Sequence, residues 1–200
     1  PAPRLEQQPG GDREFRNGLP TLARLAEELT SPVVAKETGC GLSRAVAKKI
    51  FDTGVRTVDV SGAGGTSWVA VEVHRAQGDQ RALGDTFWDW GIPTAGSVAQ
   101  LSGLGFGICA TGGMKDGLMM AKALAVGARG GGIARPFLQA QARGGRDEVR
   151  RVAQRIISEI RVACLLTGSR TPADLVGKPV VIGDRLRRWV PAGSPLAGRV

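Results

Sequence analysis

The 200-residue chain contains no tyrosine, one histidine and three cysteines. The cysteines, Cys40, Cys109 and Cys164, are far apart and odd in number, which argues against a disulfide framework and a cysteine-based metal site. A single histidine, His74, cannot by itself build a zinc site. No order of serine, histidine and aspartate favours a catalytic triad. We therefore predict no metal site in this chain and interpret His74 as a surface or structural residue.

Long apolar runs are also missing. No stretch approaches the roughly 20 apolar residues that a membrane-spanning helix needs. Residues 1–11 are polar and rich in proline, without the apolar core of a signal peptide. We therefore expect a cytoplasmic protein that has no membrane partner.

The formal net charge is +9, which can indicate nucleic acid, a membrane surface or anionic substrates as partners. The basic residues are spread along the chain, and the densest cluster is Arg185, Arg187 and Arg188. No nucleic-acid-binding motif accompanies that cluster, and there is no tyrosine to stack on bases. We expect no specific nucleic-acid partner and interpret the charge as a solvated, arginine-rich surface.

Glycine is abundant, at 30 residues, and it clusters behind short apolar runs. These runs alternate with helical patterns, which predicts successive βα units. The runs are mostly apolar rather than alternating, as expected for parallel strands that are buried on both faces. The predicted strands are residues 32–36, 57–60, 106–110 and 130–134.

Capping residues predict the helices between these runs. Ser43 and Asp116 are candidate N-caps, and Gly54 and Gly127 would end the two helices. Pro93 favours a loop entering a helix over a strand at that point. A long helix is predicted over residues 147–166, with an apolar face of Val149, Val152, Ala153, Ile156, Ile160 and Ala163.

Four βα units make half of an eightfold barrel, so the predicted fold class is α/β, half of a TIM (β/α)₈ barrel. A smaller doubly wound sheet is the competing architecture. The predicted organisation is an N-terminal lead-in and helix over residues 1–31, the half-barrel over residues 32–176, and a basic C-terminal tail over residues 177–200.

Two glycine loops follow predicted strands in the manner of a phosphate site. In the loop at residues 111–117, glycines would let backbone N–H groups reach a phosphate, and the following helix N-terminus would favour its charge. The loop at residues 130–135 offers Arg135 as a second partner. Because the last two loops of such barrels often share one phosphate, the pair predicts a phosphate-binding site.

Other candidate site residues have a structural alternative. Lys36 ends a strand predicted to be buried, so it would either form a salt bridge or face an electron-rich ligand such as a flavin ring. Ser61 and Thr66 bracket a glycine loop, where hydroxyls could bind a ligand or merely cap a turn. Glu72 follows that loop, either as a functional carboxylate or as a solvated one.

Five segments together resemble one enzyme family, type 2 isopentenyl-diphosphate isomerase, over about residues 8–176. They are PVVAKETGCGLS (32–43), VDVSGAGGTSW (58–68), WGIPTA (90–95), ATGGMKDG (110–117) and GIARPF (132–137). The resemblance implies an FMN-dependent (β/α)₈ barrel that interconverts isopentenyl and dimethylallyl diphosphate in isoprenoid biosynthesis. It implies FMN reduced by NADPH and Mg²⁺ as cofactors, with the flavin acting in proton transfer.

The same resemblance assigns roles to individual residues. Trp68 and Glu72 match positions near the flavin and the substrate, which makes them candidate catalytic residues. The residues that would bind FMN or its phosphate are Lys36, Ser61, Thr66, Gly113, Met114, Lys115, Ala134 and Arg135.

The chain also departs from the family pattern near residue 1. The family's substrate glutamine and metal glutamate fall on Arg4 and Leu5, which cannot do that work, since leucine offers no oxygen and arginine repels a cation. The family's histidine and first four strands have no counterpart here. We therefore expect a truncated C-terminal half with little or no isomerase activity alone, and a homo-oligomer if complete. The alternatives are an α-hydroxy-acid oxidase-like barrel and a non-catalytic flavin-binding fragment.

Overall fold

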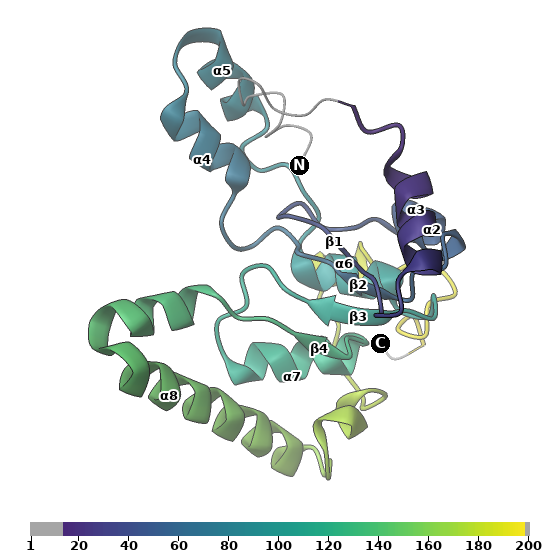
Figure 1. Ribbon diagram of the computed structural model, residues 1–200. Coiled ribbons are helices and arrows are strands. Elements are labelled where there is room, and N and C mark those ends of the chain that lie inside the picture. The colour runs from purple at the N-terminus through teal and green to yellow at the C-terminus, as the bar shows by residue number, and fades with distance from the viewer. Residues whose placement is uncertain (1–13, 199–200) are drawn as a thin grey trace.

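The structure is a computed structural model that describes residues 14–198, and its centre is a four-stranded parallel sheet (Figure 1). The strands are β1 (Val34–Lys36), β2 (Thr57–Asp59), β3 (Gly107–Ala110) and β4 (Gly130–Gly131). They pair in the order β1-β2-β3-β4, and every pair is parallel. The predicted α/β class and strand positions are confirmed, although β4 has two residues where five were expected. A doubly wound sheet reverses its strand order, whereas these strands follow one another without a reversal.

Helices connect the strands, and two of the predicted caps hold them. The Ser43 hydroxyl accepts a hydrogen bond from the N–H of Val46, and the Asp116 carboxylate accepts one from Met119. The prediction that Pro93 precedes a helix is also confirmed. The helices around the sheet are α2 (Gly18–Glu28), α3 (Arg44–Asp52), α6 (Thr94–Leu101), α7 (Gly117–Val126), α8 (Arg135–Leu166), the 3₁₀ turn η1 (Pro172–Leu175) and α9 (Asp184–Arg187).

Helix α8 is longer than the predicted 147–166. It starts at Arg135 and bends at Gly144 and Gly145, whose backbone dihedrals are not helical. The chain is helical on both sides of the bend, so the predicted helix is the part that follows the two glycines. Val152 and Ile156 of the predicted apolar face are buried.

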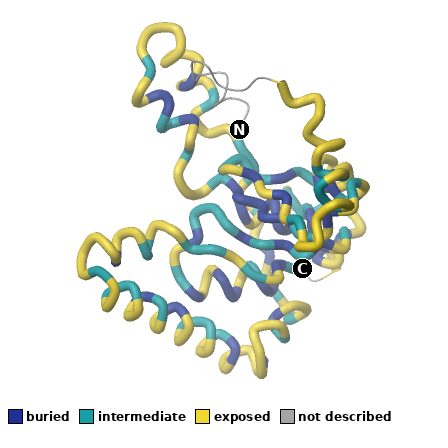
Figure 2. Tube along the Cα trace, in the orientation of Figure 1, coloured by how far each residue is buried: buried dark blue, intermediate teal, exposed yellow. Residues whose placement is uncertain are grey.

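The main core lies between one face of the sheet and the helices that cover it (Figure 2). Ala35, Val58 and Ile108, from three neighbouring strands, are all buried in it. On β1 the residues flanking Ala35 are exposed, and Val34 keeps 51% of its surface accessible. The expectation of strands buried on both faces is therefore wrong for β1.

The segment after residue 177 is not a loose tail. Its arginines, Arg185, Arg187 and Arg188, are exposed, as expected for a solvated basic surface. However, Ile182 and Leu196 are each only 1% exposed and belong to the main core. Ile182 and Leu196 are fourteen positions apart and belong to no helical or strand period, so the sequence pattern did not identify them as core residues.

Between β2 and α6 the chain forms two helices, α4 (Trp68–Arg75) and α5 (Gly78–Thr86), which stand away from the sheet (Figure 1). Ser67 caps α4 by accepting a hydrogen bond from Ala70. Glu72 is only 6% exposed within this helix, so its interpretation as a solvated loop carboxylate is wrong.

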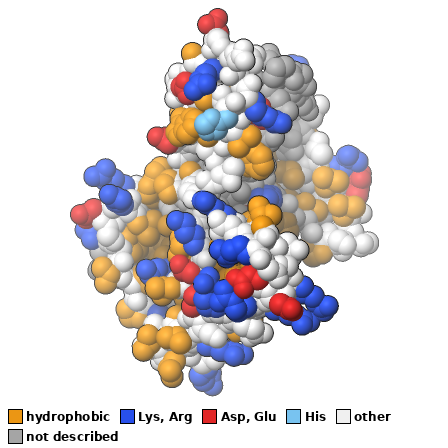
Figure 3. Space-filling model, turned by 90° about the vertical axis from the view of Figure 1, so that its left-hand side faces the viewer, with side chains coloured by type: hydrophobic (Ala, Val, Ile, Leu, Met, Phe, Trp, Pro, Cys, Tyr) orange, Lys and Arg blue, Asp and Glu red, His pale blue; other side chains and the backbone are white. Residues whose placement is uncertain are grey.

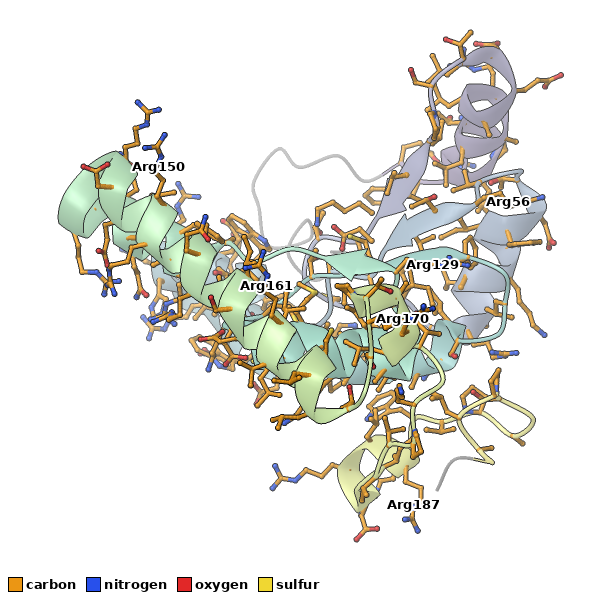
Figure 4. The ribbon with its side chains drawn as sticks, turned by 90° about the horizontal axis from the view of Figure 1, so that it is seen from below. Arg56, Arg129, Arg150, Arg161, Arg170 and Arg187 are labelled. Carbon is orange, nitrogen blue, oxygen red and sulfur yellow. The ribbon has the colours of Figure 1, made fainter. Side chains whose placement is uncertain are left out.

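Charged side chains are dispersed over the surface. Arg150 and Arg161 extend from α8, whereas Arg187 extends from α9 near the other end of the molecule in this view (Figure 4). On the face shown in Figure 3, basic and acidic side chains are interspersed. In the part of the chain that the structure describes, no helix combines the length and apolar character needed to cross a membrane.

Candidate flavin and phosphate site

Most of the predicted cofactor-binding residues lie at the carboxyl ends of β1, β2, β3 and β4 or on the loops that leave them. Because the strands are parallel and adjacent, these four loops meet at one edge of the sheet. Direct backbone hydrogen bonds join them: Gly41 donates to Ser61, and Gly62 donates to Thr111. The edge is therefore one connected surface built from segments about 100 residues apart.

Lys36, at the end of β1, is paired with an acid that the sequence interpretation missed. Its ammonium nitrogen lies 3.5 Å from Asp59 Oδ2 and donates to the carbonyl of Glu37 at 2.9 Å. The Lys36 side chain is 53% exposed, so the expectation of a buried lysine is wrong. A lysine ammonium carries three donors, so the two contacts leave capacity for a ligand. Asp59 occupies the register position beside Lys36, and this cross-strand pairing was the signal that could have identified it.

Asp59 joins three strand ends. Its other oxygen, Oδ1, accepts hydrogen bonds from the N–H of Ser61 at 3.0 Å and from the hydroxyl of Thr111. Ser61 has φ +34°, the only positive φ among the non-glycine residues that the structure describes. The bond from the Ser61 N–H to the aspartate two residues earlier is of the Asx-turn type. Asp59 therefore helps hold the loop that carries Ser61.

Cys109 lies beside this pair, in register with Asp59. Burial raises the pKa of the Cys109 thiol, the negative charge of Asp59 raises it further, and the positive charge of Lys36 opposes both. A thiol with a raised pKa is a poor nucleophile near neutral pH. The arrangement therefore does not favour Cys109 as a reactive cysteine.

The glycine loops after β2 and β3 touch backbone to backbone. A Cβ on Gly113 would lie 2.2 Å from the Gly64 carbonyl oxygen, and one on Gly65 would lie 2.8 Å from the Gly113 nitrogen. Gly112 and Gly113 both have positive φ, +99° and +74°. Only glycine allows this approach at these positions.

This contact leaves a row of backbone donors. Within residues 14–198, the N–H groups of Gly112, Gly113, Met114 and Lys115 have no hydrogen-bond acceptor. The Met114 side chain is buried in a hydrophobic cluster, so Met114 can offer a ligand only its backbone. Lys115 is exposed and adds a positive charge. Successive free N–H groups beside a lysine suit a phosphate.

The sequence predicted that the N-terminus of α7 would favour the phosphate charge, but carboxylates already bind its N–H groups. The Gly117 N–H donates to Glu159 of α8 at 2.6 Å, and the Met119 N–H donates to Asp116. Two carboxylates thus already occupy the first turn, where the phosphate charge was expected to be favoured. The donors for an anion are in the preceding loop, not in the helix.

Ala134 and Arg135 lie where β4 passes into α8, and both are exposed. A Cβ on Gly132 would lie 3.0 Å from the Thr111 methyl group, so this loop also touches the end of β3. The structure thus brings the two predicted phosphate loops to adjacent positions on the edge.

A pocket of about 430 Å³ opens next to the glycine loop that follows β2. Thr66 and Trp68 line it together with two further tryptophans, Trp88 and Trp90, that had no predicted role. Its other wall is the loop after β1. That loop is held by the Glu37 carboxylate, which accepts hydrogen bonds from the N–H groups of Thr38, Gly39 and Cys40 at 2.6–2.8 Å.

Glu72 and His74 are not among the residues that line this pocket. Glu72 is buried in α4, with one oxygen 3.6 Å from an Arg75 nitrogen. His74 packs edge-on against Trp88, with ring centroids 5.7 Å apart, which agrees with a structural role. Of the two candidate catalytic residues, Trp68 lines the pocket, whereas Glu72 is buried in α4 and is not part of the lining.

The described residues offer no cluster for a metal ion: residues 14–198 contain no group of three or more His, Cys, Asp and Glu side chains arranged to hold one. Arg4 and Leu5, which take the place of the family's glutamine and metal glutamate, lie outside the described residues.

Sequence comparison identifies relatives that match most of this chain. The chain is 45% identical over 185 residues to isopentenyl-diphosphate delta-isomerase of Thermococcus onnurineus, and the match covers 92% of this chain and 50% of that protein. It is 41% identical over 184 residues to the enzyme of the same name from Methanothermobacter thermautotrophicus, covering 92% and 52%. The chain therefore spans about half the length of the curated relatives that it matches.

Solved structures resemble the fold at lower identity. Flavocytochrome b2 with benzoylformate matches at a TM-score of 0.60 and 22% identity, covering 87% of this chain and 44% of that one. A mandelate oxidase with 2-hydroxy-phenylacetamide matches at 0.58 and 23%, covering 82% and 43%. Residues 12–181 match the family described as FMN-dependent dehydrogenase. With that match over most of its length, this chain belongs to the FMN-dependent dehydrogenase family.

Proposed function

We propose that this chain supplies the FMN-binding part of an isopentenyl-diphosphate delta-isomerase. The observation that carries the proposal is that Lys36, the Ser61 loop and the N–H groups of residues 112–115 meet at one edge of the sheet, and that these N–H groups have no acceptor within residues 14–198. The relatives at 41–45% identity that carry this name support the choice of reaction. Substrates would be isopentenyl and dimethylallyl diphosphate.

The residues at this edge fit FMN by their chemistry. The backbone donors of Gly113, Met114 and Lys115, with Ala134 and Arg135 nearby, would hold the phosphate. Ser61 and Thr66 would donate hydrogen bonds to the ribityl chain, and Lys36 would face the ring. When bound, reduced FMN would supply the proton-transfer chemistry of the isomerisation. The chain's own groups would orient the cofactor and offset its negative charge.

We further propose that the four βα units form half of a (β/α)₈ barrel. Four parallel strands in sequential order, with an exposed face at β1, are the arrangement that such a half would have. The two flavin enzymes of similar fold are each matched over 43–44% of their length, which agrees with a half. The remaining strands would come from a complementary half.

The same proposal gives roles to the two candidate catalytic residues and to further cofactors. Trp68 would contact the substrate from the pocket wall, and Glu72 would hold α4 in place or act near the substrate. The resemblance implies Mg²⁺, reduction of FMN by NADPH, a cytoplasmic location and a homo-oligomer, and we carry these as expectations for the whole protein.

The test combines cofactor binding with turnover. FMN is titrated into the purified protein, and binding is followed by the change in flavin fluorescence. Isopentenyl diphosphate, Mg²⁺ and reduced FMN are then supplied, with and without an added N-terminal half from a relative, and dimethylallyl diphosphate is measured. We expect FMN binding in both samples and turnover when the second half is present.

Two other outcomes would reject this proposal in distinct ways. FMN binding without turnover in the completed barrel would indicate a non-catalytic flavin-binding module. Bleaching of bound FMN by a hydroxy acid such as lactate or mandelate would indicate an α-hydroxy-acid oxidase. We expect no such bleaching, because residues 61–66 contain no histidine and His74 packs on Trp88.

A further inference from the structure

The cation at the proposed flavin site has a built-in counter-ion. Asp59 is the acid nearest to the Lys36 ammonium, and its side chain is only 13% exposed. Glu37 is next to Lys36 in sequence, but its carboxylate oxygen Oε2 is turned into its own loop, where it accepts hydrogen bonds from three N–H groups. Within residues 14–198, Asp59 is the carboxylate that forms an ion pair with Lys36.

The position of Asp59 is itself determined by contacts on its other oxygen. Oδ1 is held by the Ser61 N–H and the Thr111 hydroxyl, which leaves Oδ2 directed toward Lys36. Both donors come from loops that form the proposed FMN site. Any ligand held by these loops would therefore meet Lys36 and Asp59 as a fixed charge pair.

We propose that Asp59 is a positioning residue that anchors Lys36 and limits the positive charge that Lys36 presents to the flavin. This inference rests on the proposed FMN binding. Two-electron reduction adds negative charge to the flavin ring, so a nearby cation favours the reduced cofactor and a nearby anion disfavours it. The pair would set an intermediate preference between the two redox states. The Asp59 carboxylate raises the pKa of the Cys109 thiol and the Lys36 ammonium lowers it. Both charges therefore act on a third group at the same end of the sheet.

The test compares the dissociation constants of oxidised and reduced FMN in four proteins: the unmodified chain, Asp59→Asn, Lys36→Met and the double variant. Asparagine retains an oxygen that can accept from Ser61 and Thr111, so the turn is preserved while the charge is lost. We expect Asp59→Asn to increase the preference for reduced FMN about tenfold and Lys36→Met to decrease it about tenfold. A tenfold change in this ratio corresponds to about 30 mV for a two-electron couple.

The double variant gives the sharpest result. Removing both charges restores a neutral pair, so its preference for reduced over oxidised FMN should return to within about threefold of the unmodified protein. Asp59→Glu, which keeps the charge, should also stay near the unmodified value. Asp52→Asn is the matched control, because Asp52 ends α3 at the opposite edge of the sheet and its change alters the net charge equally.

The possible failures are distinguishable. If the unmodified protein binds FMN in neither redox state, the proposed function and this inference are both overturned. If all variants are folded by circular dichroism and bind FMN but the Asp59→Asn ratio is unchanged or lower, only the inference is overturned. A double variant more perturbed than either single variant would show a structural role for Asp59 and would also overturn it.

Discussion

The carboxylate of Glu159 in α8 accepts a hydrogen bond at 2.6 Å from the backbone N–H of Gly117, the first residue of α7. The two residues are 42 positions apart, so a side chain from one helix caps another. The fit is close, because a Cβ on Gly117 would lie 2.4 Å from the Ile156 carbonyl oxygen. Glu159 therefore satisfies a donor that the first turn of α7 cannot satisfy itself.

Replacing Glu159 should cost stability rather than cofactor binding. We expect Glu159→Ala to lower the free energy of unfolding by about 1–3 kcal/mol, because it leaves a partly buried N–H without its charged acceptor. Glu159→Gln should cost less, since its amide oxygen can still accept. Gln154→Ala, on the exposed side of the same helix, is the control and should change little. Urea unfolding followed by circular dichroism measures the difference, and equal losses in all three variants would contradict the interpretation.

Two glycines with the same backbone conformation separate strain from the effect of crowding. Gly113 and Gly193 both have φ +74°, but a Cβ on Gly113 would collide with the Gly64 backbone, whereas one on Gly193 would meet nothing within 4 Å. We expect Gly113→Ala to weaken FMN binding more than tenfold, because the two glycine loops must separate. Gly193→Ala should leave the FMN dissociation constant unchanged and cost about 1 kcal/mol of stability through strain alone. Equal FMN affinity in both variants would reject the proposed contact.

The Cys109 thiol reports the charges at the sheet edge through its pH dependence. Because the Asp59 carboxylate raises the pKa of this thiol, Asp59→Asn should lower the pKa and increase the thiolate fraction at pH 8. Alkylation of Cys109 by iodoacetamide should then become several-fold faster, and Lys36→Met should slow it. Mass spectrometry of the peptide containing Cys109 gives the rate across pH 7–10. Asp52→Asn should leave the rate unchanged, and an acceleration there would point to net charge instead.

Two neighbouring side chains of the C-terminal segment should differ in how much stability is lost when each is shortened to alanine. Ile182 is 1% exposed and Val181 is fully exposed. We expect Ile182→Ala to lower the free energy of unfolding by about 2–5 kcal/mol, because it leaves a cavity in the main core. Val181→Ala should stay within about 0.5 kcal/mol of the original protein. Thermal or urea unfolding of the two variants tests whether this segment is part of the folded domain, and a small loss for Ile182→Ala would show that it is not.

Local features of the sequence were sufficient for the strands, several helix ends and the glycine loops. Ser43 and Asp116 cap helices in the structure as predicted, because a cap depends on residues within three or four positions of itself. The glycine loops follow their strands as predicted, because a strand end and the turn after it are contiguous in the chain. The resemblance to one enzyme family also rested on contiguous motifs, and it agrees with the relatives found by comparison.

Tertiary structure alone decided which side chains meet. The sequence did not indicate that Asp59 faces Lys36, that Glu159 occupies the start of α7, or that Glu72 is buried in a helix. Ile182 and Leu196 were assigned to a tail, although they complete the core. The partners of Asp59 and Glu159 are 23 and 42 residues away and lie on different elements. Their contact depends on how strands register and helices pack, which no local period or propensity encodes.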